Sequence, residues 1–423
     1  NNVAVGRSAL TANTTADYNT AIGMDALKSA TTGAQNTMVG ALSGDAITTG
    51  QYNVGMGIHA VGSTTTASSN TGIGYNALFA NTTGANNVAV GANALDAATT
   101  ASVNTAVGSN ALGATTTGQQ NVAVGANSLD ANTTGGDNVA VGTGALGANT
   151  TATNNTAVGH LALTANTTGA QNTSIGALAM DAHTTGSNNT SVGYESLGKS
   201  TTGGGNVAIG RAALLDTTTT SNNVAVGVEA LENNIATGNT AVGYQSLRNN
   251  TTGYGNTAFG LDAGKTTTTG AGNVFIGDIS GGGTNGTTTG IGNTFVGYQC
   301  ESAGTGGNYQ IVLGFDLLSV ADSTTFTFGR GTGNNRVSNN FDSNASFARV
   351  SDQRYKDEIL DNTDCGLDFI NALRPITYKW RAKSDIDSSL PDYDAEITER
   401  QHDTKLYGLI AQEVKEALDD NGI

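Results

Sequence analysis

The sequence has little of what usually marks a disulfide-rich, metal-binding or bulky globular protein. Its 423 residues include 2 cysteines, 2 prolines and 1 tryptophan, and only 12% of the residues are charged. Cys300 and Cys365 lack metal-ligand spacing and define no redox compartment. The 4 histidines are scattered along the chain. We therefore expect no metal site and no cofactor.

Basic stripes and long apolar runs are also missing. The formal net charge is −16, so the sequence predicts neither a nucleic acid nor an anionic membrane surface as partner. No apolar run is long enough to span a bilayer and no signal peptide is present, so no membrane insertion is expected. Because the sequence begins inside a repeat, we expect it to be part of a longer chain.

What the sequence does have is a five-residue phrase that recurs from Asn2 almost to residue 300. One copy is residues 138–142 (Asn-Val-Ala-Val-Gly), and the next begins 17 residues later at Asn155. The step shortens once, before Asn239, and lengthens once, before Asn293. A fixed period of this kind is typical of a solenoid, in which each short unit buries its apolar face against its neighbours. The sequence predicts a mainly β protein, a parallel β-solenoid of 17-residue coils.

Two neighbouring positions of the phrase differ in size. The fourth position is apolar in every copy, as at Val124 and Val141, and we expect it to point into the core of its own coil. The third position is usually alanine, as at Ala123 and Ala140. Since side chains alternate across a strand, these alanines should lie on the opposite face. A small apolar face suits the same strand from two other copies around a threefold axis, so the pattern predicts a homotrimer.

The rest of each coil also has a regular composition. The pair Ala145 and Leu146 is expected to fill the core from the other side, as a second strand or a bent extended segment. Thr134 and Gly135 belong to a Thr-Thr-Gly corner, where glycine is expected to supply a positive backbone dihedral. The leading asparagines, such as Asn138, can form hydrogen-bonded ladders from coil to coil.

The composition changes twice toward the C-terminus. Periodicity fades near Asn308, and charged residues, both prolines and Trp380 follow residue 350. Three domains are predicted: a β-solenoid shaft (1–307), a β-rich cap or transition (308–350) and a small α+β domain (351–423). Strands are expected at 325–328, 345–350 and 375–380, and helices at 364–373 and 408–418.

Three ordered motifs in the last domain carry a resemblance. Residues 351–359, 373–380 and 407–414 resemble the C-terminal intramolecular chaperone of phage endosialidases and tail fibres. Members of that family assemble a trimeric fibre and then cut themselves off. Because family members usually continue past the third motif, we expect the chaperone domain ending at Ile423 to be incomplete.

The resemblance also implies a site. Ser351 would be the nucleophile, Lys356 its general base, and the bond between Val350 and Ser351 the one that breaks. Asp352 and Arg354 would support them, since a neighbouring cation lowers the pKa of a lysine and so makes it a better base. Without the family, Ser351 would be interpreted as the cap of a helix or turn that begins at Asp352, and Lys356 as a solvated charge.

The repeat region separately resembles the heads of YadA-like trimeric autotransporter adhesins. These are left-handed parallel β-rolls whose coils carry a similar Asn/Ser-x-Ala-Val/Ile-Gly phrase, with a period shorter than 17. The resemblance implies a trimeric head built from stacked coils.

Together these features predict a structural trimeric fibre of a phage tail for host-surface attachment, located in the virion or at an extracellular surface. Its partners would be a host cell-surface receptor or glycan and other tail or anchoring proteins. Any enzymatic activity would be at most a single cis cleavage by a serine–lysine endopeptidase. A bacterial trimeric surface adhesin or extracellular filament protein is the alternative. A glycan-degrading spike is disfavoured, because Asp130, Asp137 and Asp181 lie on turns without aromatic neighbours.

Overall fold

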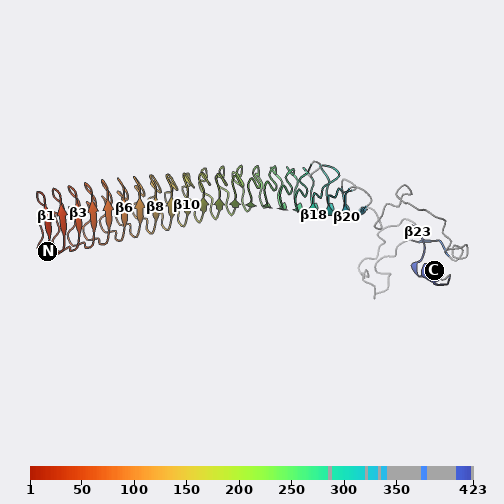
Figure 1. The fold of residues 1–423 in the computed structure, drawn as a ribbon, viewed down its shortest axis with the longest axis horizontal. Coiled ribbons are helices and arrows are strands. Elements are labelled where there is room, and N and C mark those ends of the chain that lie inside the picture. Colours follow the sequence, from red (N-terminus) through yellow and green to blue (C-terminus); the bar gives the residue numbers. More distant parts are fainter. Residues whose placement is uncertain (284–287, 320–322, 332–334, 341–372, 379–405, 421–423) are drawn as a thin grey trace. The chain divides into compact units, whose positions relative to one another are not determined.

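The fold is described by a computed structural model that covers residues 1–283, 288–319, 323–331, 335–340, 373–378 and 406–420. The chain divides into two compact units, Asn1–Arg349 and Val350–Ile423. The first unit is a stack of coils, each contributing one short strand to a single 21-stranded sheet (Figure 1).

The strands β1 to β20 follow one another along the stack, and each pairs in parallel with the next. The last strand, β21, pairs antiparallel with β20. The bounds are β1 (Val3–Val5), β2 (Thr20–Ile22), β3 (Thr37–Val39), β4 (Val54–Met56), β5 (Thr71–Ile73), β6 (Val88–Val90), β7 (Thr105–Val107), β8 (Val122–Val124), β9 (Val139–Val141), β10 (Thr156–Val158), β11 (Thr173–Ile175), β12 (Thr190–Val192), β13 (Val207–Ile209), β14 (Val224–Val226), β15 (Thr240–Val242), β16 (Thr257–Phe259), β17 (Val274–Ile276), β18 (Thr294–Tyr298), β19 (Ile311–Phe315), β20 (Thr325–Arg330) and β21 (Arg336–Asn340).

The strand register keeps equivalent phrase positions side by side. Ala123 lies opposite Ala140, and Val124 lies opposite Val141. The register persists where the repeat changes length, as Val224 pairs with Thr240. The predicted parallel β-solenoid of 17-residue coils is therefore confirmed. Parallel stacking continues beyond residue 307, through β19 and β20.

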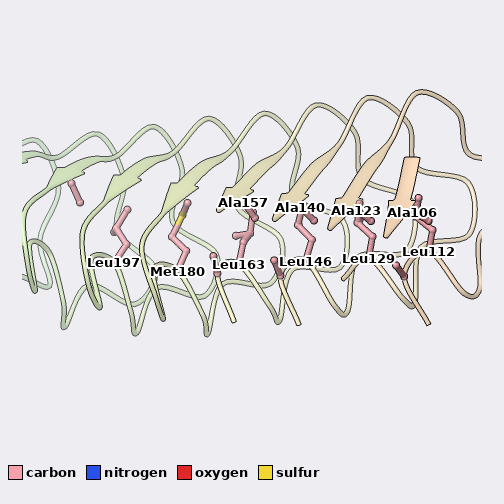
Figure 2. Close-up of a cluster of buried hydrophobic side chains, with 14 of the residues drawn as sticks. Ala106, Leu112, Ala123, Leu129, Ala140, Leu146, Ala157, Leu163, Met180 and Leu197 are labelled. Atoms are coloured by element: carbon pink, nitrogen blue, oxygen red, sulfur yellow. The ribbon is translucent and has the colours of Figure 1, made fainter. Parts of the chain in front are cut away.

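The prediction of which strand face points inward was wrong. From Ala21 onward the third-position alanines are fully buried, whereas the fourth-position side chains are partly exposed: Ala140 is 0% exposed and Val141 36%. The alanines pack in the core of their own coil against the leucine row that includes Leu129 and Leu146 (Figure 2). Small inward side chains leave room for these leucines, so the size of the alanines reflects packing within one chain.

Two coils show this packing directly, because a large side chain in one row accompanies a glycine in the other. Met38 takes the alanine position of its coil, and a Cβ added to Gly44 would lie 2.9 Å from the Met38 sulfur. Phe275 takes the same position in a later coil, and a Cβ on Gly281 would lie 2.3 Å from its ring. The two rows therefore share one space, since close-packed interiors keep their volume constant.

The segment after the phrase turns and forms no second strand. Leu129 and Leu146 are buried with positive φ angles of 50° and 52°. Left-handed geometry costs a leucine about 1 to 2 kcal/mol, which burial of its side chain offsets. The expected positive φ at the Thr-Thr-Gly corner was also wrong: it belongs to the phrase glycine, as at Gly142 with φ 138°.

Asparagine ladders run through the stack as predicted. The backbone N–H of Asn138 donates to Asn121 Oδ1 (3.1 Å), and Asn138 Nδ2 donates to the same oxygen (3.1 Å) and to the Ala152 carbonyl (2.9 Å). A second ladder follows Asn132 and Asn149, where Nδ2 of the latter donates to Oδ1 of the former (3.0 Å). The leading ladder thereby gives each buried amide partners within the stack, whereas in the second ladder the side-chain oxygens of Asn81, Asn166 and Asn250 are buried without a hydrogen-bond partner.

The second unit contains two described strands and one described helix. β22 (Ile376–Tyr378) pairs antiparallel with β23 (Leu406–Gly408), and α2 (Ala411–Asp420) follows. β22 falls within the strand expected at 375–380, and α2 overlaps the helix expected at 408–418. The strand expected at 345–350 and the helix expected at 364–373 lie outside the described residues, except for Leu373.

Candidate functional site

The cleavage site implied by the sequence falls in a segment that the structure does not describe. Val350, Ser351, Asp352, Arg354 and Lys356 all lie outside the described residues. Their roles therefore remain predictions, without geometry.

The described part of the second unit does bring two of the three C-terminal motifs together. Arg374 precedes β22 and Glu413 lies in the first turn of α2, and the Arg374 Nε donates to Glu413 Oε2 at 3.2 Å. A second hydrogen bond joins Arg374 Nη2 to Glu413 Oε1. The hydrogen bond from Arg374 lowers the pKa of Glu413, and its counterpart raises the pKa of Arg374. This bidentate pair links the motif at 373–380 to the motif at 407–414.

The first unit presents a continuous uncharged surface on the solvent side of its sheet, in which an apolar row runs beside a row of valines and threonines. We define the outward sheet face as the second and fourth phrase positions of β1 to β19. The fourth-position side chains exposed by more than a third include Val5, Met56, Val124, Val141, Ile175, Phe259 and Ile276. Because the strands pair in register, these side chains form unbroken rows along the stack.

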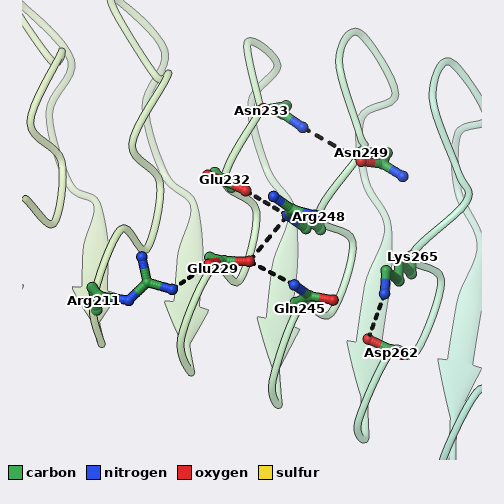
Figure 3. Close-up of polar contacts among 9 residues, drawn as sticks. All are labelled: Arg211, Glu229, Glu232, Asn233, Gln245, Arg248, Asn249, Asp262 and Lys265. Carbon is green, nitrogen blue, oxygen red and sulfur yellow. Dashed lines mark hydrogen bonds and ion pairs between the residues drawn. The ribbon is translucent and has the colours of Figure 1, made fainter.

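A charged cluster lies on the turns around the shortened coil (Figure 3). Glu229 accepts hydrogen bonds from Arg211 and from Gln245 Nε2 (2.6 Å), and its Oε2 is 3.2 Å from Arg248 Nε. Arg248 Nε also donates to Glu232 Oε2 at 2.5 Å. The hydrogen bond from Gln245, helped by that from Arg211, lowers the pKa of Glu229. The cluster joins successive coils by charge where the repeat is irregular.

The acidic residues considered for glycan cleavage do not form a catalytic pair. Burial raises the pKa of Asp130 and of Asp181. The two lie in one row three coils apart, so their separation is about 14 Å at the usual strand spacing. Paired carboxylates of glycosidases are roughly 5 to 9.5 Å apart. Asp137 is exposed on another part of the coil.

His183 is part of the buried ladder and is not a ligand candidate. Its Nε2 is 2.9 Å from the Gly186 carbonyl and its Nδ1 is 3.2 Å from Ser200 Oγ. Burial lowers the pKa of His183, which favours the neutral ring. It occupies a position that asparagine fills in other coils, such as Asn149 and Asn166.

Among the described residues, no group of three or more His, Cys, Asp and Glu side chains is placed to hold a metal ion. None of the helices in this part of the chain is long and apolar enough to cross a membrane. Cys300 is buried with a free thiol, and Cys365 lies outside the described ranges.

The stack of in-register coils defines the first unit as a fibrous protein of the parallel β-solenoid class. For the second unit, residues 351–423 match the family described as chaperone of endosialidase. The match spans all three motifs on which the resemblance was based, so that resemblance is confirmed. No curated protein matches the chain.

The outward sheet face is the feature that the sequence interpretation missed. Apolar residues at both the third and fourth positions gave no direct indication of which side was inward. One signal could have shown which row faces inward: a large side chain in the third-position row accompanies a glycine in the leucine row. This is so for Met38 with Gly44 and for Phe275 with Gly281.

Proposed function

We propose that this chain is the shaft of a homotrimeric phage tail fibre that attaches the virion to a host surface. The observation that carries the proposal is the match of residues 351–423 to the chaperone of endosialidase, following a long β-solenoid. That family implies trimeric assembly. The shaft would occupy residues 1–307, a transition 308–350, and the chaperone 351–423. A host receptor or glycan and other tail or anchoring proteins would be its partners.

A shaft of this kind has a physical need for a chaperone. Three nearly identical chains can be displaced by one coil and still bury almost the same surface, because each coil repeats its neighbour. A trimerising domain at one end removes these alternatives by fixing the starting level of all three chains. A bacterial trimeric adhesin or extracellular filament remains the alternative function, and the solenoid alone favours it.

Release of the chaperone would proceed by one cis cleavage. The Ser351 hydroxyl oxygen attacks the Val350 carbonyl carbon while the neutral Lys356 amine accepts the hydroxyl proton. The C–N bond breaks, the proton passes to the departing α-amine of Ser351, and an ester joins the two residues. Water then hydrolyses the ester, which leaves a carboxylate on Val350 and regenerates the Ser351 hydroxyl. Asp352 and Arg354 would assist, with the Arg354 charge favouring neutral Lys356.

The test compares the masses of the purified full chain and a Ser351→Ala variant, with sedimentation of both. We expect the wild type to yield a fragment ending at Val350, and the variant to stay intact and to sediment as three chains. Identical intact masses would refute the cleavage, and a monomeric variant would refute the fibre. Lys356→Arg keeps the positive charge, but arginine stays protonated and cannot accept the Ser351 proton. This variant should also stay uncleaved.

A further inference from the structure

We propose that the outward sheet face is the surface through which three copies of this chain pack around a common axis, with equivalent strands at one level. This inference rests on the proposed homotrimeric fibre and names the surface that holds it together. The sequence pattern had assigned the trimer contact to the alanine rows, but these are buried inside their own coils. The outward sheet face therefore takes their place as the trimer contact.

The composition of the face is that of a buried surface. In β1 to β18 the second phrase position is always valine or threonine, and in β1 to β19 the fourth is valine, isoleucine, methionine, phenylalanine or leucine. Neither row contains a charged residue. All-parallel sheets are normally covered on both faces and have apolar residues on both. By contrast, the exposed row just before the phrase contains Gln120, Asp137 and Asn154, as expected of a solvated surface.

The area of the face is sufficient for a stable interface. With a strand spacing of about 4.8 Å and a rise of about 3.3 Å per residue, nineteen three-residue strands cover roughly 900 Å². Soluble monomers rarely expose apolar patches above a few hundred Å². Around a threefold axis each face is divided between two neighbours, and three faces together amount to about 2,700 Å², compared with the roughly 1,200 to 2,000 Å² in total that a stable two-chain interface buries. A face of this size, if left in water, would make the shaft prone to aggregation, whereas two further copies would cover it.

The order of residues along the rows favours copies that run in the same direction and start at the same level. The fourth-position side chains differ in size, from valine to Met56 near one end and Phe259 near the other. Packing about an axis along the stack places each of these beside its own copies. The shortened coil before Asn239 and the lengthened coil before Asn293 do not interrupt the rows. Val226 still pairs with Val242, and Ile276 with Val296. An antiparallel pair would set unlike levels against each other.

The experiment is disulfide cross-linking of the full chain, with Cys300→Ala and Cys365→Ser as background. Val141→Cys places a thiol on the outward sheet face. Thr134→Cys places one at an exposed Thr-Thr-Gly corner of the preceding coil, as a matched control. If the fourth-position side chains of three copies meet at the axis, as proposed, three thiols at one level come within disulfide reach, a Cα separation below about 7 Å. Oxidation should then link roughly two of every three Val141→Cys chains. Thr134→Cys should stay uncross-linked.

Sedimentation and circular dichroism of each variant before oxidation separate the possible failures. Trimers that cross-link through Thr134→Cys and not through Val141→Cys would overturn the assignment of this face while leaving the fibre intact. A folded wild-type chain that sediments as a monomer would instead contradict the proposed function itself. Cross-linking at both positions would indicate association between fibres, and would also overturn the assignment.

Discussion

The shortened coil, residues 223–238, stacks on its neighbours with the same sheet and ladder contacts as the regular coils before it, but with different contacts at its corner. In the regular coils the Asn138 N–H donates to Asn121 Oδ1 at 3.1 Å, and in the shortened coil the Asn239 N–H donates to Asn223 Oδ1 at 3.0 Å. The strand register is also unchanged. Loss of one residue therefore leaves the sheet and the phrase intact.

The corner absorbs the missing residue. In a regular coil the Thr133 N–H and hydroxyl both donate to the Thr150 carbonyl, at 2.8 and 3.1 Å. In the shortened coil the Ile235 N–H donates to the Thr251 carbonyl at 2.9 Å. Isoleucine has no hydroxyl for the second bond, and the nearby cluster around Glu229 adds charged contacts between coils. The geometry of the sheet and its phrase glycines is therefore the same in every coil, whereas the corners and turns tolerate changes in length and sequence.

The largest expected effect comes from the fixed part. A Cβ on Gly142 would lie 2.3 Å from the Gly159 carbonyl oxygen of the next coil, at a φ of 138°. Gly142→Ala should therefore cost about 3 kcal/mol or more through clash and backbone strain. Urea unfolding followed by circular dichroism at fixed protein concentration measures the loss.

The matched control for this prediction is Gly135→Ala, at the corner of the same region. Its Cβ would also approach a carbonyl, that of Ala152 at 2.4 Å, but φ is ordinary there. Other coils carry Ala101 and Ala152 at this position. We therefore expect a smaller cost than at Gly142, because the corner can shift to accept a Cβ while its backbone stays unstrained. Equal losses for the two variants would contradict the distinction between fixed sheet and tolerant corner.

An intermediate effect tests which rows share the core. Ala140→Met should overpack the regular coil and cost about 1 to 3 kcal/mol. Leu146→Gly should leave a cavity and cost about 2 to 5 kcal/mol. Combining them reproduces the Met38 and Gly44 pair, so the double variant should be more stable than the sum of losses predicts by at least about 1 kcal/mol. Strict additivity in the thermodynamic cycle would mean that the two positions do not contact each other.

The smallest expected effect is in the irregular coil. Glu229→Gln removes the anion that Arg211 and Arg248 share, and should cost about 1 to 2 kcal/mol at neutral pH. In a regular coil, Asp216→Asn removes a more exposed pair with Lys199 and should cost less than Glu229→Gln, because solvent screens the pair.

The pH dependence of Glu229→Gln has a defined sign. Because the pKa of Glu229 is lowered in the folded chain, its contribution is present above the ordinary glutamate pKa of about 4.3. It is lost as the pH falls through the folded value. Unfolding midpoints of wild type and Glu229→Gln should thus converge in acid. A constant difference across the pH range would assign the effect to packing and not to charge.

The second unit could be recognised from its sequence, but its internal contacts could not. Order and spacing of three motifs were enough to identify the chaperone family, because such motifs are read without knowing where side chains lie. The contact between Arg374 and Glu413 was not predicted, since 39 residues separate them and only the pairing of β22 with β23 brings their motifs together.

The sequence by itself determined the solenoid, its period, the parallel register and the asparagine ladders, because all of these follow from self-similarity at a fixed step. It could not decide which apolar row faces inward. Alternation across a strand separates Ala140 from Val141 but does not say on which side the rest of the coil lies. Only the tertiary structure decided that, because the left-handed turns at Leu129 and Leu146 fold the chain back over the alanines and leave the valines outside.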